Sequence, residues 1–102
     1  MAPVKQYFVY MVRCSDETYY VGITSDLEHR IGQHNFGWDP HSYTHNRRPV
    51  TLAYATDFTR VEDAIRFEKQ LKGWSRAKKR ALIAGNWNEI VRLSNHPSTG
   101  SG

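Results

Sequence analysis

The sequence contains a single cysteine, Cys14, among its 102 residues, and it has no long apolar run. One cysteine cannot form an intramolecular disulfide, and a lone cysteine in a strand-like segment is usually a small apolar filler. Because a membrane-spanning helix needs about 20 consecutive apolar residues, the sequence predicts no membrane span. The first ten residues also lack the apolar stretch of a secretory signal. We therefore expect a cytoplasmic protein that does not bind a membrane.

Acidic residues are fewer than basic ones, with ten Asp and Glu against fourteen Lys and Arg, which gives a net charge of +4. This surplus favours an anionic partner such as nucleic acid, although many basic surfaces only keep a protein soluble. Apolar residues make up 39% of the chain, enough to exclude wholesale disorder. The length predicts one domain over residues 1–95, and the Pro-, Ser- and Gly-rich residues 96–102 are expected to be a disordered tail. No obligate protein partner is evident.

Two short apolar segments near the start of the chain predict a β-hairpin. Residues 7–13 (YFVYMVR) and 18–23 (TYYVGI) are rich in aromatic and branched side chains, and the turn residues Ser-Asp-Glu lie between them. If this connection is three residues long, Cys14 pairs with Thr18, and the even-numbered residues of both strands share one face. Tyr10 and Tyr20 are then diagonal neighbours. A connection of two residues would place them on opposite faces.

The rest of the chain alternates between helical and extended patterns, with a polar loop over residues 36–49. The predicted elements are a helix over 27–35, a strand over 50–58, a helix from Thr59 to about Trp74 with a Thr59–Glu62 capping box, a basic helix over 76–84, and a final helical turn or two over 87–93. These elements predict an α/β (α+β) fold in which a small three-stranded antiparallel sheet is flanked by helices.

A carboxylate interrupts the apolar seam of the helix that starts at Thr59. Glu68 stands where the seam requires an apolar side chain, and burial of an unpaired carboxylate is costly. One interpretation turns Glu68 toward solvent and pairs it with Lys72 one turn later. The other makes it a ligand of Mg²⁺, which typically takes one or two carboxylates together with phosphate oxygens and water. The other seam residues are Val61, Ala64, Ile65 and Leu71.

Arg30 and His34 lie one turn apart on the helix over 27–35, so both project from the same side. Residues at this spacing are often only solvated, but an arginine can also hold a phosphate with its forked donors while a histidine carries a proton beside it. Tyr10 and Tyr20 also have two interpretations: they are packing residues, or their hydroxyls take part in catalysis. A phenol has a pKa of ~10 and acts as a base only where a cation stabilises the phenolate.

Basic residues gather in two further places, the polar loop and the basic helix near Trp74. The second cluster could hold phosphates while Trp74 stacks a base. Equally, it could be the solvated face of a helix whose Leu82 and Ile83 point inward, and both interpretations stay open. The candidates for nucleic-acid binding are Arg47, Arg48, Lys72, Arg76, Lys78 and Lys79.

The order of these residues resembles the GIY-YIG nuclease family. Phe8-Val9-Tyr10 stands in the place of the GIY tripeptide, and Tyr20-Val21-Gly22 stands in the place of YIG. Arg30 and His34 match the family's helical arginine and its companion, and Glu68 matches its metal-binding glutamate. The resemblance extends over residues 7–93 and is nearest to short stand-alone members.

The resemblance implies an endonuclease that hydrolyses phosphodiester bonds in nucleic acid, with DNA favoured and a role in repair or recombination. It also implies one Mg²⁺ or Mn²⁺ ion, held by Glu68. In this scheme Tyr10 takes the proton of the attacking water, directly or through a neighbour, and Tyr20 orients the water or the phosphate. Arg30 neutralises the phosphoryl oxygens, and His34 supports the phosphate or Tyr10.

The sequence departs from the family pattern at two positions. Phe8-Val9 replaces the Gly-Ile of the first motif, and Ile23 stands where some branches place a lysine that activates the tyrosine. Asn86 is a candidate for an asparagine that many members carry near the site. Two alternatives to an endonuclease remain. One is a nucleic-acid-binding module with the same fold and no turnover, and the other is a protein-interaction domain with a basic face.

Overall fold

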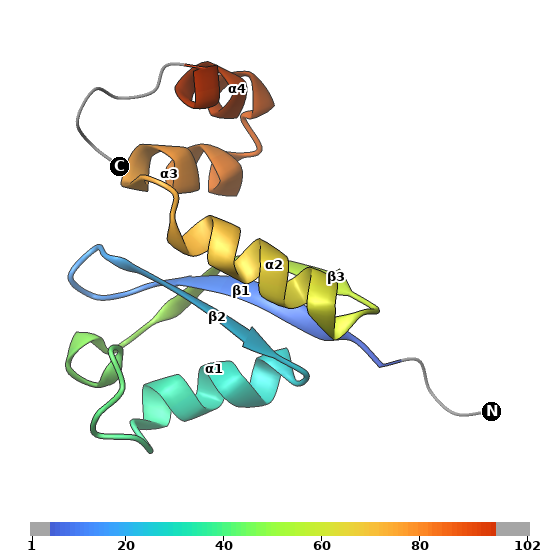
Figure 1. The fold of residues 1–102 in the computed structure, drawn as a ribbon. Coiled ribbons are helices and arrows are strands. Elements are labelled where there is room, and N and C mark those ends of the chain that lie inside the picture. The colour runs from blue at the N-terminus through green and yellow to red at the C-terminus, as the bar shows by residue number, and fades with distance from the viewer. Residues whose placement is uncertain (1–4, 96–102) are drawn as a thin grey trace. The chain divides into compact units, whose positions relative to one another are not determined.

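The computed structural model describes residues 5–95, and the tail predicted over 96–102 lies outside them. The elements in chain order are β1 (Tyr7–Arg13), β2 (Tyr19–Thr24), α1 (Leu27–Phe36), the 3₁₀ helix η1 (His45–Arg47), β3 (Thr51–Phe58), α2 (Val61–Lys72), α3 (Arg76–Ala84) and α4 (Trp87–Asn95) (Figure 1). The predicted α+β fold with a three-stranded antiparallel sheet is confirmed. No helix of residues 5–95 is long and apolar enough to cross a membrane.

The chain forms two compact units, Met1–Lys72 and Gly73–Gly102. The first unit contains the sheet with α1 and α2. In the second unit α3 packs on α4, and Leu82 is buried together with Ala81 and Ile90, whereas Ile83, also expected to point inward, is half-buried. A single domain over residues 1–95 stays a prediction.

The sheet has the strand order β2-β1-β3, so β1 is central and β2 is an edge strand. Tyr10 stands opposite Gly22, which follows Tyr20 by two residues. The backbone amide of Cys14 donates to the carbonyl of Thr18 at 2.8 Å, as the three-residue connection requires. The even-numbered residues of both strands therefore share one face. The diagonal placement of the two tyrosines is confirmed, with ring centroids 6.4 Å apart.

Helices α1 and α2 cover opposite faces of the sheet (Figure 1). On the even-numbered face, Leu27 and Ile31 of α1 pack against a buried cluster of Tyr10, Val12, Cys14 and Val50. Helix α2 contacts all three strands and buries Ala64 and Leu71. The odd-numbered face carries the buried residues Val9, Met11 and Val21. The central strand β1 is thus covered on both faces, whereas β3 is half-buried to exposed along its length.

Helix α2 differs from its prediction in two ways. It begins at Val61, so Thr59 lies too early to cap it, and Glu62 pairs with Arg60, with 3.7 Å between Oε2 and Nε. The predicted capping box is therefore wrong. Ile65, expected in the seam, is 41% exposed. The contact between the rings of Phe67 and Phe58, with centroids 5.7 Å apart, turns a neighbouring side of the helix toward β3 instead.

The loop between α1 and β3 is fixed at both ends by side chains. Asn35 bonds both backbone groups of Val50, donating to its carbonyl at 3.0 Å and accepting from its amide at 2.7 Å. Arg48 donates to the carbonyl of His45 at 2.7 Å and to that of Phe36 at 3.3 Å. These bonds fold the predicted polar loop back against the end of α1.

Candidate active site

The phenol of Tyr10 lies across Gly22 of the neighbouring strand. A Cβ added to Gly22 would come within 2.5 Å of the Tyr10 hydroxyl oxygen and within 2.6 Å of its Cζ. Any side chain at this position would displace the ring, so the glycine of the second motif is required by the tyrosine of the first. Because β2 is an edge strand, this packing carries the Tyr10 hydroxyl toward the edge of the sheet.

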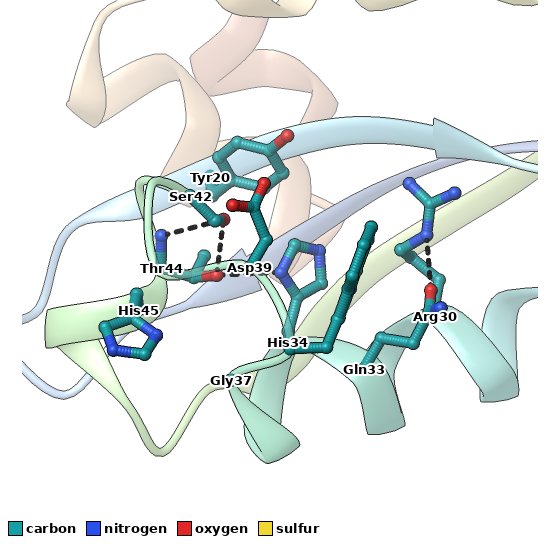
Figure 2. Close-up of a pocket in the computed structure, with 10 residues that line it drawn as sticks. Tyr20, Arg30, Gln33, His34, Gly37, Asp39, Ser42, Thr44 and His45 are labelled. Carbon is teal, nitrogen blue, oxygen red and sulfur yellow. Dashed lines mark hydrogen bonds between the residues drawn. The ribbon is translucent and has the colours of Figure 1, made fainter.

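The Tyr10 hydroxyl begins a chain of hydrogen bonds that ends in the loop. It lies 2.8 Å from His34 Nε2, and His34 Nδ1 lies 2.8 Å from the hydroxyl of Thr44. The Thr44 hydroxyl in turn lies 3.1 Å from that of Ser42 (Figure 2). Tyr10 and Thr44 are completely buried, and His34 is nearly so. Helix α1 supplies His34, the middle residue of this chain, and Thr44 of the loop bonds the ring nitrogen that faces away from Tyr10.

Burial and charge set the protonation of this chain. Burial raises the pKa of Tyr10 to about 12, and Tyr20 and Glu68 also raise it, whereas the charge of Arg30 and its hydrogen bond to the phenol act in the opposite direction. Burial, with the charge of Arg30, lowers the pKa of His34. At neutral pH both groups are therefore uncharged. A neutral imidazole accepts at one ring nitrogen and donates at the other, as the two neighbouring hydroxyls allow.

Helix α1 places Arg30 beside the phenol. Leu27 and Ile31 pack into the core, which fixes the rotation of the helix and directs Arg30 and His34 to the same side. The Nε atom of Arg30 donates to the side-chain oxygen of Gln33 at 3.1 Å. The predicted common side of Arg30 and His34 is confirmed, because each interacts with Tyr10.

Tyr20 forms an aromatic wall next to His34. The two rings are edge to face, with centroids 5.3 Å apart, and Tyr20 stacks on Tyr43 at 6.0 Å with an interplanar angle of 23°. The guanidinium of Arg47 lies 3.9 Å from the centroid of the Tyr43 ring. Tyr20 is therefore held by packing on the side of the loop.

Glu68 lies against the protein and not in bulk water. Its side chain is 16% exposed, and its Oε2 lies 3.6 Å from Lys72 Nζ, so the ion pair of the first interpretation is present. The carboxylate also raises the pKa of Tyr10, which puts it within electrostatic reach of the phenol. Glu68 is therefore paired with Lys72 and at the same time acts on the Tyr10 phenol. Metal binding by Glu68 stays a prediction.

Several of the basic residues predicted to bind nucleic acid have partners inside the protein. Arg47 donates to Asp16 Oδ2 at 3.0 Å and to the carbonyl of Tyr43 at 2.8 Å, and Arg48 holds the end of α1. These two arginines stabilise the loop. The other candidates are Lys72 on α2, paired with Glu68, and Arg76, Lys78 and Lys79 on α3 of the second unit.

In the second unit, Lys78 Nζ lies 4.3 Å from the centroid of the Trp74 ring, so a cation already covers this indole. Asn86, the candidate for a site asparagine, instead accepts a hydrogen bond from the amide of Glu89 at 3.1 Å at the start of α4. This bond is the usual one for a helix cap. Nucleic-acid binding by α3 stays a prediction.

A pocket of about 110 Å³ opens in the first unit beside the Tyr10 group. The sequence did not predict its loop residues, because a polar loop has no periodicity that tells which side chains turn inward. Thr44 is the clearest case, since it is completely buried although its neighbours are polar. The lining residues are Tyr20, Arg30, Gln33, His34, Gly37, Trp38, Asp39, Ser42, Thr44 and His45 (Figure 2).

Comparison with known proteins agrees with this arrangement. Residues 6–81 match the model of the GIY-YIG catalytic domain, a range that includes Tyr10, Tyr20, Arg30, His34 and Glu68. A UPF0213 protein of Halobacterium salinarum is 45% identical over 75 residues, which is 74% of this chain and 96% of the relative. A UPF0213 protein of Staphylococcus haemolyticus is 40% identical over 78 residues, or 76% of this chain and 94% of the relative.

A solved structure shows the same similarity. The solution NMR structure of the UPF0213 protein BH0048 from Bacillus halodurans is 34% identical, with a TM-score of 0.52, and the match covers 87% of this chain and 97% of that one. The family of the matching model is of the endonuclease type, whereas these relatives carry no more than a family designation. The sequence resemblance is thus confirmed, and the chain belongs to the GIY-YIG family, with the small UPF0213 proteins as its relatives.

Proposed function

We propose that this protein is a divalent-metal-dependent endonuclease that hydrolyses phosphodiester bonds in nucleic acid, with DNA as the favoured substrate. The observation that supports this most is the position of the Tyr10 hydroxyl. It lies 2.8 Å from His34 Nε2, and Arg30 and Glu68 both act on its pKa. Tyr10 thus lies beside a proton acceptor and an anion-binding group, and within electrostatic reach of the carboxylate proposed to hold the metal. Branched and damaged DNA, which arise in repair and recombination, are the first substrates to test.

His34 gives Tyr10 a route for its proton. With a pKa raised to about 12, the phenol alone is a poor base at neutral pH. Hydrogen-bonded to a neutral imidazole, it can pass its proton to His34 Nε2 while it takes one from the attacking water. Nδ1 then donates to Thr44, which keeps Nε2 as the acceptor. Some family branches activate this tyrosine with a lysine at the position of Ile23. In this proposal His34 takes over that role.

Arg30 supplies the positive charge that faces the phosphate. Its Nε bond to Gln33 holds the guanidinium on the side of Tyr10. Fixed donors of this kind stabilise the charge that develops on the phosphoryl oxygens, and removal of one donor typically costs about 10²- to 10³-fold in rate. Tyr20, on the same face of the sheet, is the residue that orients the water or the phosphate.

Glu68 is the residue that would hold Mg²⁺ or Mn²⁺. Among residues 5–95 no group of three or more His, Cys, Asp and Glu side chains could enclose a metal ion. A single, mostly buried carboxylate fits an ion whose remaining ligands are phosphate oxygens and water. When bound, such an ion stabilises the leaving oxygen. Lys72 is paired with this carboxylate, so its ammonium would compete with the metal for it.

Cleavage of supercoiled and branched DNA in the presence of Mg²⁺ tests this proposal. We expect Arg30→Ala and Glu68→Ala to lose at least about 100-fold in rate. Glu62→Ala is the matched control, because Glu62 is an exposed glutamate of the same helix that pairs with Arg60, and it should cleave like the wild type. Equal cleavage by all four proteins would reveal a contaminating nuclease and end the proposal.

A second candidate is a nucleic-acid-binding module without turnover. The Glu68–Lys72 ion pair favours it, since a carboxylate that is already paired binds a cation less readily. This candidate predicts salt-sensitive binding that persists in Glu68→Ala. It also predicts that no product forms on addition of Mg²⁺ or Mn²⁺. Metal-dependent cleavage that is lost in Glu68→Ala would rule it out.

A further inference from the structure

We propose that the pocket next to Tyr20 binds one unpaired nucleobase of the substrate strand, adjacent to the phosphate held by Arg30. This inference rests on the proposed function only in taking nucleic acid as the ligand. It adds a substrate class, because a nuclease with such a pocket prefers strands that present an unpaired base beside the cleavage position. The argument uses the place, the size and the chemistry of the pocket.

The place of the pocket follows from residues that it shares with the active-site group. Tyr20, Arg30 and His34 line the pocket; the rings of Tyr20 and His34 also contact Tyr10, and Arg30 acts on its pKa. A group bound there lies beside the phosphate that Arg30 would hold. In a nucleic-acid strand the group next to a phosphate is a nucleoside, so its base can enter while the backbone stays at Arg30.

The size of the pocket restricts what can enter. A volume of about 110 Å³ suits a single flat ring system and is well below that of pockets for larger ligands. A base pair does not fit. The base must therefore come from a single strand, a bulge or a nucleotide turned out of the duplex, which is least costly where the base is already unpaired.

An aromatic side chain offers the surface on which a base can stack. Trp38 lines the pocket and is 58% exposed, although an indole is among the most favourable side chains to bury. Tyr20 supplies a second ring in the lining, and it is held by its stack on Tyr43. Stacking of a base on an aromatic residue contributes roughly a 10-fold gain in affinity or more, for any base.

The charge in the pocket argues against a second phosphate and for an amino-bearing base. Asp39 lines the pocket, and it forms no ion pair within the described part of the chain. One of its oxygens accepts from the amide of His41 at 3.0 Å. Its carboxylate repels phosphate but accepts hydrogen bonds from the N–H groups of guanine or cytosine. Figure 2 places Asp39 on the same side of the loop as Tyr20 and His34.

Binding of a short fluorescent duplex with one unpaired central nucleotide tests the proposal. The full chain is titrated in EDTA, so that no strand is cut, and the unpaired residue is guanine, thymine or an abasic sugar. We expect the guanine probe to bind best and the abasic probe to bind worst, with roughly a 10-fold difference between them. Equal affinity for the guanine and abasic probes would refute the pocket.

Three variants show which residue is responsible. Trp38→Ala should bind the guanine probe no better than the abasic one, whereas Trp38→Phe should keep most of the preference. Asp39→Asn should reduce the preference for guanine over thymine, since an amide presents a donor as well as an acceptor. The matched control is Trp87→Ala, which removes another exposed indole and should change nothing. A loss with Trp87→Ala equal to that with Trp38→Ala would overturn the assignment.

The outcome separates the pocket from the proposed catalysis. Base-dependent binding without any cleavage in Mg²⁺ would support the pocket and remove the endonuclease. Cleavage that is equally fast on the guanine and abasic probes, with equal binding, would remove the pocket and leave the endonuclease. Thermal melting of each variant identifies any loss of binding that comes from unfolding.

Discussion

Replacement of Gly22 by alanine tests the contact that joins the two tyrosine motifs. The added Cβ would lie 2.5 Å from the Tyr10 hydroxyl oxygen, 2.6 Å from Cζ and 2.9 Å from Cε1. Tyr10 is completely buried, so its ring has no open space in which to move. Overpacking of this kind costs about 1–3 kcal/mol, and loss of the buried bond to His34 costs about 1–3 kcal/mol more. We expect Gly22→Ala to lower the free energy of unfolding by about 2–6 kcal/mol.

Urea denaturation followed by circular dichroism measures this change. Gly32→Ala is the matched control, because a Cβ at Gly32, inside α1, meets no atom within 4 Å. It should stabilise the protein by up to about 1 kcal/mol through its greater helix propensity. Tyr10→Phe combined with Gly22→Ala should be less than additive, since the first change removes the oxygen that the second one displaces.

The reasoning would be refuted by a Gly22→Ala protein that is as stable as the wild type. It would also be refuted if the DNA-cleavage activity of that protein were unchanged, since a displaced Tyr10 cannot keep its bond to His34. A stable protein with lost activity would mean that the ring moves at little cost, which contradicts the packing argument but not the chemistry.

The remaining predictions concern the groups around Tyr10. Thr44→Val should remove the bond to His34 Nδ1, shift the tautomer seen by ¹⁵N NMR and change the pH profile of cleavage, whereas Thr44→Ser should restore both. Burial lowers the pKa of His34 below its unfolded value of 6.5. The contribution of the neutral imidazole to the free energy of unfolding is therefore fully present above pH 6.5 and is lost as the pH falls toward the folded pKa. Urea titrations at several pH values should show this pH dependence, and His34→Gln should weaken the dependence. Lys72→Ala removes the ammonium 3.6 Å from Glu68 and should tighten Mn²⁺ binding measured by electron paramagnetic resonance, and unchanged Mn²⁺ affinity would argue against Glu68 as the ligand.

The hairpin and its register could be predicted because side-chain alternation in strands is strict. Once the connection was taken as three residues, the common face of Tyr10 and Tyr20 followed. The common side of Arg30 and His34 followed from helical spacing in the same way. These predictions needed only the geometry of a single helix or of one pair of adjacent strands.

Other features depend on contacts between distant segments. Ile65 was expected in the core, but the contact of Phe67 with Phe58 on β3 determines which side of α2 is buried. Trp38, Asp39 and Thr44 enter the site through a loop whose path is set by bonds such as those between Asn35 and Val50. No local pattern records such a path, so the pocket could not be predicted from the sequence.

The Asn35 amide has a consequence for how this molecule can be redesigned. By satisfying both backbone groups of Val50, it anchors the chain just before β3 independently of what the preceding residues do. Insertions or deletions between Gly37 and Ser42 should therefore leave the bonds from Thr44 to His34 and on to Tyr10 intact. Residues 38–41 are thus the stretch in which the pocket can be changed while the bonds among Tyr10, His34 and Thr44 are kept.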